Sequence, residues 1–383
     1  MEESFFYRIY VSPDGGLLYD LSGDLSDFVW EQRTNEPDVL TISVPDPFKV
    51  MGHALKEGML IALELGTDQA HPLVFRGIIY TVESTFPGAG TPVVTLKAYD
   101  SLKELGMHAH SPPAWDDKPL SDVIKGIVQV PNYKFQQVMV SLSADVKVME
   151  VQINKTDLQQ LHDICDEFGC VFFVEPQLSG KDNFIFTDYV TLMQHMPPGV
   201  VLSHGRTGMV TGLTEFHGTV DADHFQVPYQ LAGTDRRTGK PLAVSVRRPT
   251  PMGVFDDPFL HENLAAIEDG VKRGMIEALI GAVPAAAEKV KQLRLGGAEA
   301  EAVVGEYVLT TPEELALNAS NWFSVNANGM TGTGKTGGTP ALRTHMTVQL
   351  DDVGGRFSGT WFLTEVRHVV GRDGYHTEFS CKR

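Results

Sequence analysis

The last forty residues of the chain carry its clearest alternation of apolar and polar positions. Residues 344–351, 357–370 and 375–383 each alternate, and glycine-rich or charged turns separate them. Alternation with a period of two between turn residues is typical of antiparallel strands. We therefore predict a β-meander over Thr344–Arg383. So short a meander cannot bury both of its faces alone, so it needs partner strands from elsewhere in the chain.

Residues 1–103 show short apolar runs separated by Gly, Pro and Asp, which is typical of a β-barrel or sandwich. The predicted strands are Phe5–Val11, Asp27–Arg33, Asp38–Val44, Met59–Leu65, Leu73–Ser84 and Val93–Asp100. Gly77 lies inside one of these runs, where a strand bends or carries a bulge as a sheet closes. This favours a barrel, and residues 1–103 are predicted to form the first one.

Residues 104–200 change to a mixed pattern and are predicted to form a small α+β domain. Residues 119–128 give an amphipathic helix that opens with proline. A second helix follows Thr156, which makes a capping box with Gln159, and it ends at Gly169. Two apolar strands then follow, at residues 170–174 and 183–189.

The β pattern returns at residues 209–250, and we predict that Thr344–Arg383 pairs with these strands and not with residues 1–100. A second, discontinuous β-barrel is thus expected over residues 201–255 and 339–383. Residues 256–338 are expected to be a helical insertion with a flexible glycine-rich lead. Its predicted helices are Glu262–Gly281, Ala285–Leu295 and Thr311–Phe323. The predicted fold class is mainly β with α+β: two β-barrels, an intervening α+β domain and a helical insertion in the second barrel.

Composition narrows the possible classes of protein. The chain has 383 residues and 42% hydrophobic residues, as in ordinary globular proteins of several domains. It has no apolar run of eighteen residues and no signal-peptide pattern at its start, so we expect a soluble protein made in a cytoplasm, without membrane insertion. Its net charge of -18 disfavours specific nucleic-acid binding. Cys165, Cys170 and Cys381 include no CxxC pair, and we expect buried thiols.

One stretch fits the Walker A pattern of nucleotide-binding proteins: Gly329, Gly334, Lys335 and Thr336 stand at its fixed positions. That loop works when a strand precedes it and a helix begins at its Lys-Thr pair, so that backbone amides and the helix dipole hold phosphate. Here the run follows a predicted helix, and two glycines and a proline come directly after it. We interpret it as a false match and predict no cofactor.

No residue pattern indicates a metal or catalytic site. His108, His110, His162, His204 and His217 lack the spacing of metal ligands. His368 and His376 are expected to lie on adjacent strands and to be able to approach each other, which packing explains as well as a metal does. No GxSxG elbow, activated cysteine or carboxylate pair stands out.

Three stretches together resemble the late control gene D family, the central baseplate hub of contractile phage tails, which is related to the hub part of type VI secretion spike proteins. They are residues 73–84 with 96–105, residues 156–174, and residues 338–383. Their order and spacing extend over nearly the whole chain. The chain ends directly after the meander, so it resembles the free-standing hub and not the form fused to a spike.

The resemblance implies a homotrimer in which each subunit carries two related barrels, giving a pseudo-sixfold ring that joins a sixfold tail tube to a threefold spike. The implied partners are the tail tube or tube-initiator protein, the central spike and the surrounding baseplate proteins. DNA is expected to pass through the lumen without specific binding, and the implied location is the virion tail, assembled in the host cytoplasm. No catalysis is expected.

Other functions stay open. The same fold serves the hub of a phage-derived injection system or secretion apparatus. An enzyme, either a nucleotide hydrolase using Lys335 or a cell-wall hydrolase, is the alternative from another class. A carbohydrate-binding protein of the tail tip would need exposed aromatic residues such as Trp115 or Trp322.

Overall fold

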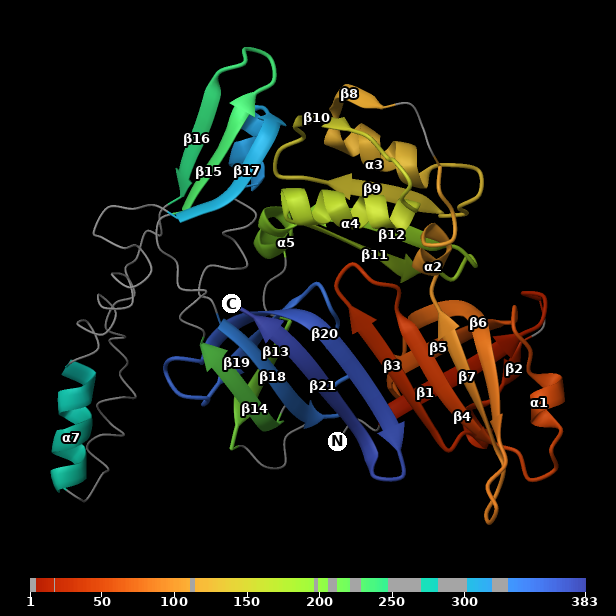
Figure 1. Cartoon of the computed structure of the whole chain (residues 1–383). Helices are drawn as coiled ribbons and strands as arrows, with labels where there is room; N and C mark the ends of the chain where they lie inside the picture. Colours follow the sequence, from red (N-terminus) through yellow and green to blue (C-terminus); the bar gives the residue numbers. More distant parts are fainter. Residues whose placement is uncertain are drawn as a thin grey trace.

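The computed structural model of the chain is mainly β (Figure 1). It describes residues 5–16, 18–110, 114–195, 199–205, 212–220, 229–246, 270–281, 302–318 and 330–383. Within these ranges one continuous sheet of 13 strands forms the base of the molecule, and one two-stranded and two three-stranded sheets accompany it.

The N-terminal β unit is a curled, open sheet. Its strands are β1 (Phe5–Ser12), β3 (Asp27–Arg33), β4 (Val39–Pro45), β5 (Leu60–Thr67), β6 (Leu73–Thr85) and β7 (Val93–Tyr99). They lie in the order β3-β4-β7-β6-β5-β1, all antiparallel, and the two-residue β2 (Tyr19–Asp20) pairs with the end of β1. All six strands were predicted from the sequence. Short helices η1 (Ser22–Asp24), α1 (Met51–Ala54) and α2 (Leu102–Leu105) connect or follow them.

The barrel predicted over residues 1–103 is not closed. Among the described strands, β1 and β3 do not pair with each other, and the outer edge of β3 pairs with β20 (Gly359–Gly371). Gly77 does not carry the predicted bulge. The register of β6 against β7 shifts at Tyr80 instead. Gly77 serves close packing instead, since a Cβ there would lie 2.2 Å from the carbonyl oxygen of Tyr99.

The C-terminal barrel is closed by six strands. These are β13 (Val200–His204), β14 (Gly212–Val220), β18 (Met330–Gly337), β19 (Thr347–Asp351), β20 and β21 (Gly374–Lys382). Their order is β13-β14-β18-β21-β20-β19, and β19 pairs back onto β13 to complete the circle. The interior is filled by Trp361, Leu363, Val366 and Phe379 with their neighbours, all buried. The predicted C-terminal meander is confirmed as β19, β20 and β21.

The predicted partners of this meander were partly wrong. β20 pairs with β3 of the first unit, Glu365 lying opposite Arg33, so Thr344–Arg383 does contact residues 1–100 through a strand ladder. The cause is the length of β20: its 13 residues extend past the end of β19 and leave half of one edge for β3. Residues 229–246, expected in the second barrel, form β15 (Tyr229–Asp235) and β16 (Pro241–Val246) of a separate sheet.

The glycine-rich run was expected to be a flexible lead, and residues 330–337 are instead strand β18, between β14 and β21. The glycines are there for packing. A Cβ on Gly334 would lie 2.3 Å from the Phe379 ring, and one on Gly332 would lie 2.8 Å from the Phe216 ring. Large side chains from both neighbouring strands fill the barrel here, so at these two positions β18 has room only for glycine. Gly329 lies outside the described residues.

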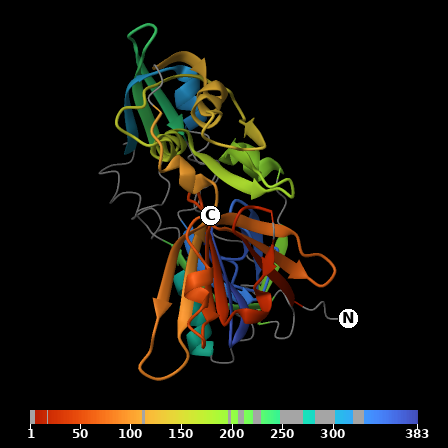
Figure 2. The same ribbon diagram turned by 90° about the vertical axis from the view of Figure 1, so that its right-hand side faces the viewer.

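The α+β domain lies across the ends of both β units (Figures 1 and 2). It consists of β8 (Trp115–Pro119), α3 (Leu120–Val128), β9 (Gln137–Ser141), β10 (Lys147–Glu150), α4 (Asp157–Phe168), β11 (Cys170–Pro176), β12 (Asp182–Asp188) and α5 (Tyr189–His195). The predicted capping box of α4 is confirmed: Thr156 and Gln159 bond reciprocally, and Gly169 ends the helix at φ +61°. The three cysteines are buried and free, as expected.

The insertion contains a strand as well as helices. Helix α7 (Gly270–Gly281) confirms the second half of one predicted helix, and residues 312–318 confirm part of another. Between them β17 (Ala302–Thr310), which was not predicted, pairs in parallel with β15. The rest of those two helices and all of the predicted helix Ala285–Leu295 lie outside the described residues. Among the described helices, none is both long and apolar enough to span a membrane.

The two β units repeat the same strand order. β3-β4-β7-β6-β5 of the first unit corresponds to β14-β18-β21-β20-β19 of the second, and every neighbouring pair in both rows is antiparallel. The sixth strand differs in direction, because β1 is antiparallel to β5 whereas β13 is parallel to β19. The chain thus contains two versions of one β unit, one open and one closed.

The packing of Gly334 can be tested by Gly334→Ala, which adds a methyl group against the Phe379 ring. We expect it to lower the free energy of unfolding by about 1–3 kcal/mol, the usual cost of overpacking a core. Urea unfolding followed by tryptophan fluorescence measures this. Thr333→Ala, one residue away on the exposed face of the same strand, is the control and should change little. Equal stability of the two variants would contradict the packing explanation.

Candidate functional site: the seam between the β units

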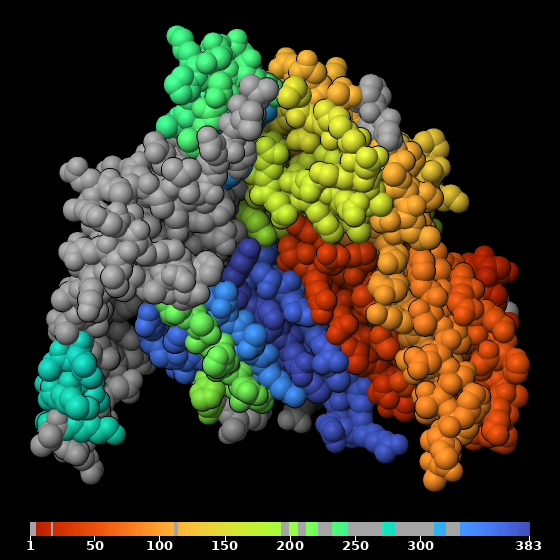
Figure 3. Space-filling model, viewed as in Figure 1, coloured from red at the N-terminus to blue at the C-terminus, as the bar shows by residue number. Residues whose placement is uncertain are grey.

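The seam joins β3 and β20 in an antiparallel ladder that makes the two β units one continuous sheet. Six pairs form it, from Glu365 opposite Arg33 to Val370 opposite Phe28. Side chains alternate across the ladder, so one face of the seam points to solvent and the other into the protein. In the space-filling view the blue surface of β20 and β21 meets the red surface of residues 27–45 along this line (Figure 3).

The outer face of the seam carries paired charges of alternating sign. Arg33 lies 3.0 Å from Glu365, and Arg367 lies 3.0 Å from both Glu31 and Glu378. Lys335 of β18 lies 3.6 Å from Glu378 and extends the row by one strand. Directly opposed charges of opposite sign favour one register over its neighbours. These side chains are partly exposed, so the row contributes more to the choice of register than to stability.

Glu378 is the shared acceptor of this row. Partial burial opposes its ionisation, but hydrogen bonds from Arg367 and His376, together with their charges, lower its pKa below the usual value. It therefore stays ionised through the neutral range. The row has a partner for each of its central charges, and it does not form a patch of one sign.

The inner face of the seam is a stack of three side chains, two of them buried and the third, Arg343, half-buried. The His368 ring lies on the Trp30 ring, with 5.0 Å between centroids and 19° between planes. The Arg343 guanidinium covers the same indole at 4.6 Å from its centroid. Trp30 and His368 are fully buried. A cation over an indole face is attracted by the ring quadrupole, and the attraction grows when water is excluded.

Hydrogen bonds hold the His368 ring in one tautomer. Its Nε2 lies 3.0 Å from the carbonyl oxygen of Leu342, which only accepts, so Nε2 carries the proton. Nδ1 then accepts from the Tyr375 hydroxyl at 2.8 Å. Burial and the charge of Arg343 lower the pKa of His368 well below its ordinary value. The imidazole is therefore neutral and structural.

Two carboxyl groups, the half-buried Asp38 and the buried Asp100, lie where the seam meets the α+β domain. Asp38 accepts a hydrogen bond from Gln32 Nε2 at 2.8 Å, and its backbone amide donates to Asp100 Oδ2 at 3.0 Å. Burial raises the pKa of Asp38 to about 7, against smaller lowering effects from Gln32, Trp30 and Arg343. Burial and the nearby Asp38 raise the pKa of Asp100 as well.

The turn after β3 attaches the α+β domain. Asn35, at φ +62°, accepts at Oδ1 from the Phe172 amide at 2.9 Å, and its carbonyl oxygen lies 2.7 Å from His162 Nε2. On the barrel side, the Tyr189 ring packs edge-on against Phe362 of β20 at 5.3 Å. The domain therefore holds both strands that form the seam, and a movement of one β unit against the other would break contacts on each side.

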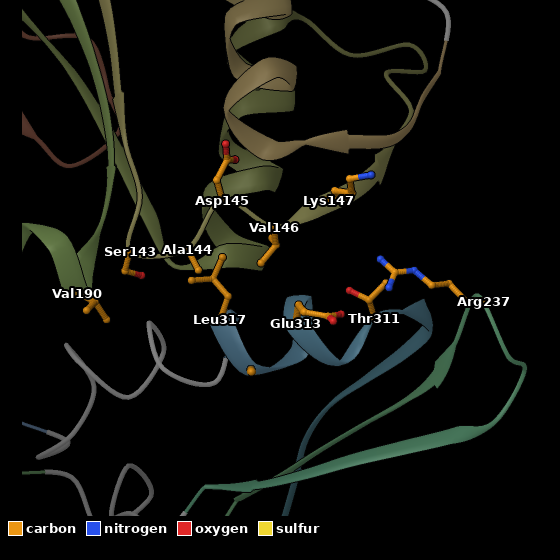
Figure 4. A pocket seen from close by; sticks show the side chains of 11 residues that line it. Ser143, Ala144, Asp145, Val146, Lys147, Val190, Arg237, Thr311, Glu313 and Leu317 are labelled. Atoms are coloured by element: carbon orange, nitrogen blue, oxygen red, sulfur yellow. The ribbon is translucent and has the colours of Figure 1, made fainter.

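A hollow of about 720 Å³ lies elsewhere, between the α+β domain and the β15–β17 sheet (Figure 4). Three of its polar side chains have partners in the chain. Asp145 accepts from the amide and hydroxyl of Ser121, and Lys147 lies 2.8 Å from Asp117. Ser143 donates to Asp188 at 2.6 Å. None of these three side chains belongs to a pair of a nucleophile and its general base.

The structure places the Walker-like residues apart from any phosphate loop. Gly334, Lys335 and Thr336 lie within β18, their positions pair with β14 on one side and β21 on the other, and Thr336 is fully buried. A Walker loop needs amides that converge on a phosphate and a helix that starts at the Lys-Thr pair. Here the segment is extended, and the residues that follow it do not form a helix.

The histidines do not converge either. His368 and His376 lie on adjacent strands as predicted, but they do not approach each other: His376 opposes Val369, points to the outer face and lies 3.1 Å from Glu378. His110 and Tyr133 both contact the buried Asp157 carboxylate, which also accepts from Gln152. Across the described ranges, no group of three or more His, Cys, Asp or Glu is placed to hold a metal.

Sequence reasoning did not single out Trp30, Asn35, Asp38 or Arg343. Trp30 and Arg343, for example, contact each other although more than 300 residues separate them in the sequence. The only local signals were a tryptophan in an alternating strand and an asparagine in the following turn.

The environment of Asp38 predicts how the free energy of unfolding changes with pH. A carboxyl whose folded pKa is about 7 and whose unfolded pKa is about 4 favours folding below pH 4, and this contribution is lost as pH rises through 7. We expect Asp38→Asn to flatten the fall in unfolding free energy between pH 5 and pH 8, by at most about 1.4 kcal/mol per pH unit. Urea titrations across that range measure the slope. The exposed Asp14→Asn is the control, and an unchanged slope in Asp38→Asn would contradict this environment.

No protein-family model and no curated protein matches this sequence. Several solved structures share its fold. The tail protein from Neisseria meningitidis MC58 has a TM-score of 0.61 at 16% identity, with 98% of this chain and 96% of that chain covered. The 43 kDa tail protein of prophage MuSo2 from Shewanella oneidensis has a TM-score of 0.62 at 11% identity, with 99% and 98% covered.

A component of the type VI secretion system of E. coli is also similar, with a TM-score of 0.56 at 9% identity. The similarity covers 94% of this chain and 73% of that one, which is itself described as similar to the bacteriophage T4 tail proteins gp27 and gp5. From end to end, this chain therefore has the fold that these tail and secretion proteins share.

Proposed function

We propose that the chain is a structural component of a phage tail baseplate and acts there as the central hub. The observation that carries this proposal is the fold similarity to tail proteins, which covers nearly the full length of both chains. A similarity over the whole chain includes the relative arrangement of the β units and the α+β domain, which an isolated shared domain would not.

The repeated β unit supports an adaptor role. One chain presents two units of the same strand order, joined rigidly at the seam. Three copies in a ring would place six such units around the axis while the remaining parts keep threefold symmetry. Such a homotrimer would join a sixfold tail tube, or its initiator protein, to a threefold central spike, with other baseplate proteins around it.

The charge of the chain suits a conduit. With a net charge of -18, three copies would carry a strongly anionic total, and an anionic wall repels the phosphate backbone. DNA would then pass through the lumen without being retained. The proposed place of the protein is the virion tail.

A hub of a phage-derived injection system or secretion apparatus is the second candidate. The likeness to the E. coli secretion component favours it, because that protein shares the fold over 94% of this chain. The physical role would be the same in both settings, since each needs a ring between a tube and a spike.

We do not propose an enzyme. The Walker-like residues lie in a paired strand, and Asp145 and Lys147 of the hollow beside the β15–β17 sheet are paired with Ser121 and Asp117. The exposed aromatic residues that a carbohydrate-binding surface needs are not supplied by Trp115, which is partly buried against the α+β core, and Trp322 lies outside the described residues.

The hub proposal predicts a ring of three copies. We expect the purified chain, alone or on addition of its tube and spike proteins, to give a particle of three times 42.0 kDa. Multi-angle light scattering measures the mass, and negative-stain images show whether a ring is present. A chain that stays monomeric under all of these conditions would contradict the proposal.

The interpretation of the Walker-like run as a false match gives a separate test. The Lys335 amine lies 3.6 Å from Glu378, on the outer row of the seam. We expect Lys335→Ala and the unaltered chain to behave alike in equilibrium dialysis with Mg-ATP, neither retaining nucleotide. Retention by the unaltered chain that is lost in Lys335→Ala would establish the enzyme alternative instead.

A further inference from the structure

We propose that β6 of one copy pairs in an antiparallel ladder with β14 of a second copy, through residues 82–86 of the first and 216–220 of the second. This inference rests on the proposed hub function and names the surface by which its copies associate. The template is the seam inside the chain, where β20 and β3 already make the corresponding ladder.

Both strands have a free edge at these residues, of which Phe86 directly follows the end of β6. β5 pairs with β6 only as far as Ile78, so beyond Tyr80 β6 has β7 on one side and no described strand on the other. β13 pairs with β14 only at Gly212 and Leu213. From Glu215 onward β14 has β18 on one side and, within the described part of the chain, no strand on the other. Unpaired edges of this kind readily accept another strand.

The free edge of β6 occupies the same place in its unit as the seam edge of β20. Each strand has 13 residues, and each shifts register once against its hairpin partner, at Tyr80 in β6 and at Thr364 in β20. Pairing with the preceding strand ends at Ile78 in the first unit and at Phe362 in the second. The bulged residues, Tyr80 of β6 and Thr364 of β20, are therefore equivalent positions, and the residues that follow them correspond one to one.

Hydrogen bonds next to the bulge repeat as well. The Ile79 amide donates to the Met59 carbonyl at 2.9 Å, and the Leu363 amide donates to the Met346 carbonyl at 3.0 Å. The reverse bonds, from Gly58 to Ile79 and from His345 to Leu363, are also both present. The edges of β6 and β20 thus have the same hydrogen-bond pattern next to the bulge. The edge of β20 is paired with β3.

β14 occupies the place of β3. A row read across the first unit runs from Ile79 through Ala98 and Leu40 to Trp30. The same row in the barrel is Leu363, Cys381, Gly332 and Gly218. Trp30 and Gly218 are therefore equivalent positions, and the register of β14 against its unit is fixed relative to β3.

The register of the new ladder follows by transfer. In the seam, His368 opposes Trp30, and their equivalents are Ser84 and Gly218. The full set of opposed pairs is Val82 with Val220, Glu83 with Thr219, Ser84 with Gly218, Thr85 with His217, and Phe86 with Phe216, the second member of each pair belonging to the other copy.

The side chains at this edge suit a buried ladder. Phe86 is 61% exposed, and its equivalent in the seam, Val370, packs against the core of the first unit. In the new ladder Phe86 would contact Phe216, which packs on the barrel core of the next copy. An exposed phenylalanine opposite an aromatic edge would lose its contact with water, which favours association.

Helix α1 does not cover the edge. A Cβ on Gly52 would lie 2.8 Å from Ser84 Oγ and 3.7 Å from Val94. The equivalent neighbours in the barrel are Leu342, whose carbonyl accepts from His368, and Thr339, whose amide donates to Thr377. Those residues pack on the inner face of β20 and β21 while β3 occupies the edge. Helix α1 takes the same place and leaves the β6 edge open.

The association is head to tail, because β6 and β14 are different surfaces of the chain. Repeating one such contact closes a ring when the rotation per copy divides a full turn. The ring would then alternate two seams, one inside each chain and one between chains. In both views the β6–β7 hairpin projects from the end of its unit that lies away from the α+β domain, where another copy can reach it (Figures 1 and 2).

Cysteine cross-linking tests the register. Thr85 and His217 are both exposed and are predicted to be directly opposed, whereas the three native cysteines are buried. Copies carrying Thr85→Cys and copies carrying His217→Cys are mixed under assembly conditions and oxidised with copper phenanthroline. We expect a disulfide-linked dimer on a non-reducing gel, because opposed positions in a ladder lie within disulfide reach.

The matched control replaces His217→Cys by Val201→Cys, an exposed site on β13 of the same barrel. We expect at least a tenfold lower yield of linked dimer. A ring of the expected mass that links equally in both mixtures, or in neither, would overturn the β6–β14 pairing and leave the hub proposal standing. A chain that stays monomeric with tube and spike proteins and gives no link would overturn both.

Discussion

Strand β20 is the constraint on which the arrangement of this protein depends. It is paired along its whole length, with β19 over its first half on one edge, with β3 over its second half, and with β21 on the other edge. A strand shared by two units cannot shift by one residue without turning every side chain to the opposite face. Trp30, His368 and Arg343 would then leave the buried stack, and the charge pairs outside would separate. The seam therefore sets both the register and the relative orientation of the two halves.

The first unit is open whereas the second is closed. A six-stranded sheet closes when its two end strands pair, and in the barrel β13 and β14 do so at two positions. In the first unit the corresponding end strand, β3, already gives its outer edge to β20. β1 pairs on its other side with β2 at Tyr10 and Val11 only. This chain thus has one open unit and one closed unit.

Local patterns in the sequence predicted local structure well and partner choice poorly. Alternation identified all six strands of the first unit, and the Thr156 capping box identified the start of α4. The glycines of β18 were misread because glycine has two uses, backbone freedom and small size, and only the positions of Phe216 and Phe379 decide between them. The β3–β20 ladder could not be read from the chain, since it depends on contacts such as those of Arg343 and His368 with a tryptophan far away in sequence.

The β3–β20 ladder inside the chain and the proposed β6–β14 ladder between copies differ in stability. Inside the chain, the central pair is His368 and Trp30, covered by Arg343 and hydrogen-bonded to Leu342 and Tyr375. At the corresponding point between copies stand Ser84 and Gly218, which bury little area and offer no stack. Buried aromatic area is the main source of stability in such contacts, so the ladder between copies is the weaker of the two. A strong internal seam with a weaker external one lets each chain fold first and associate afterwards, and it confines reversible steps of assembly to the boundary between copies.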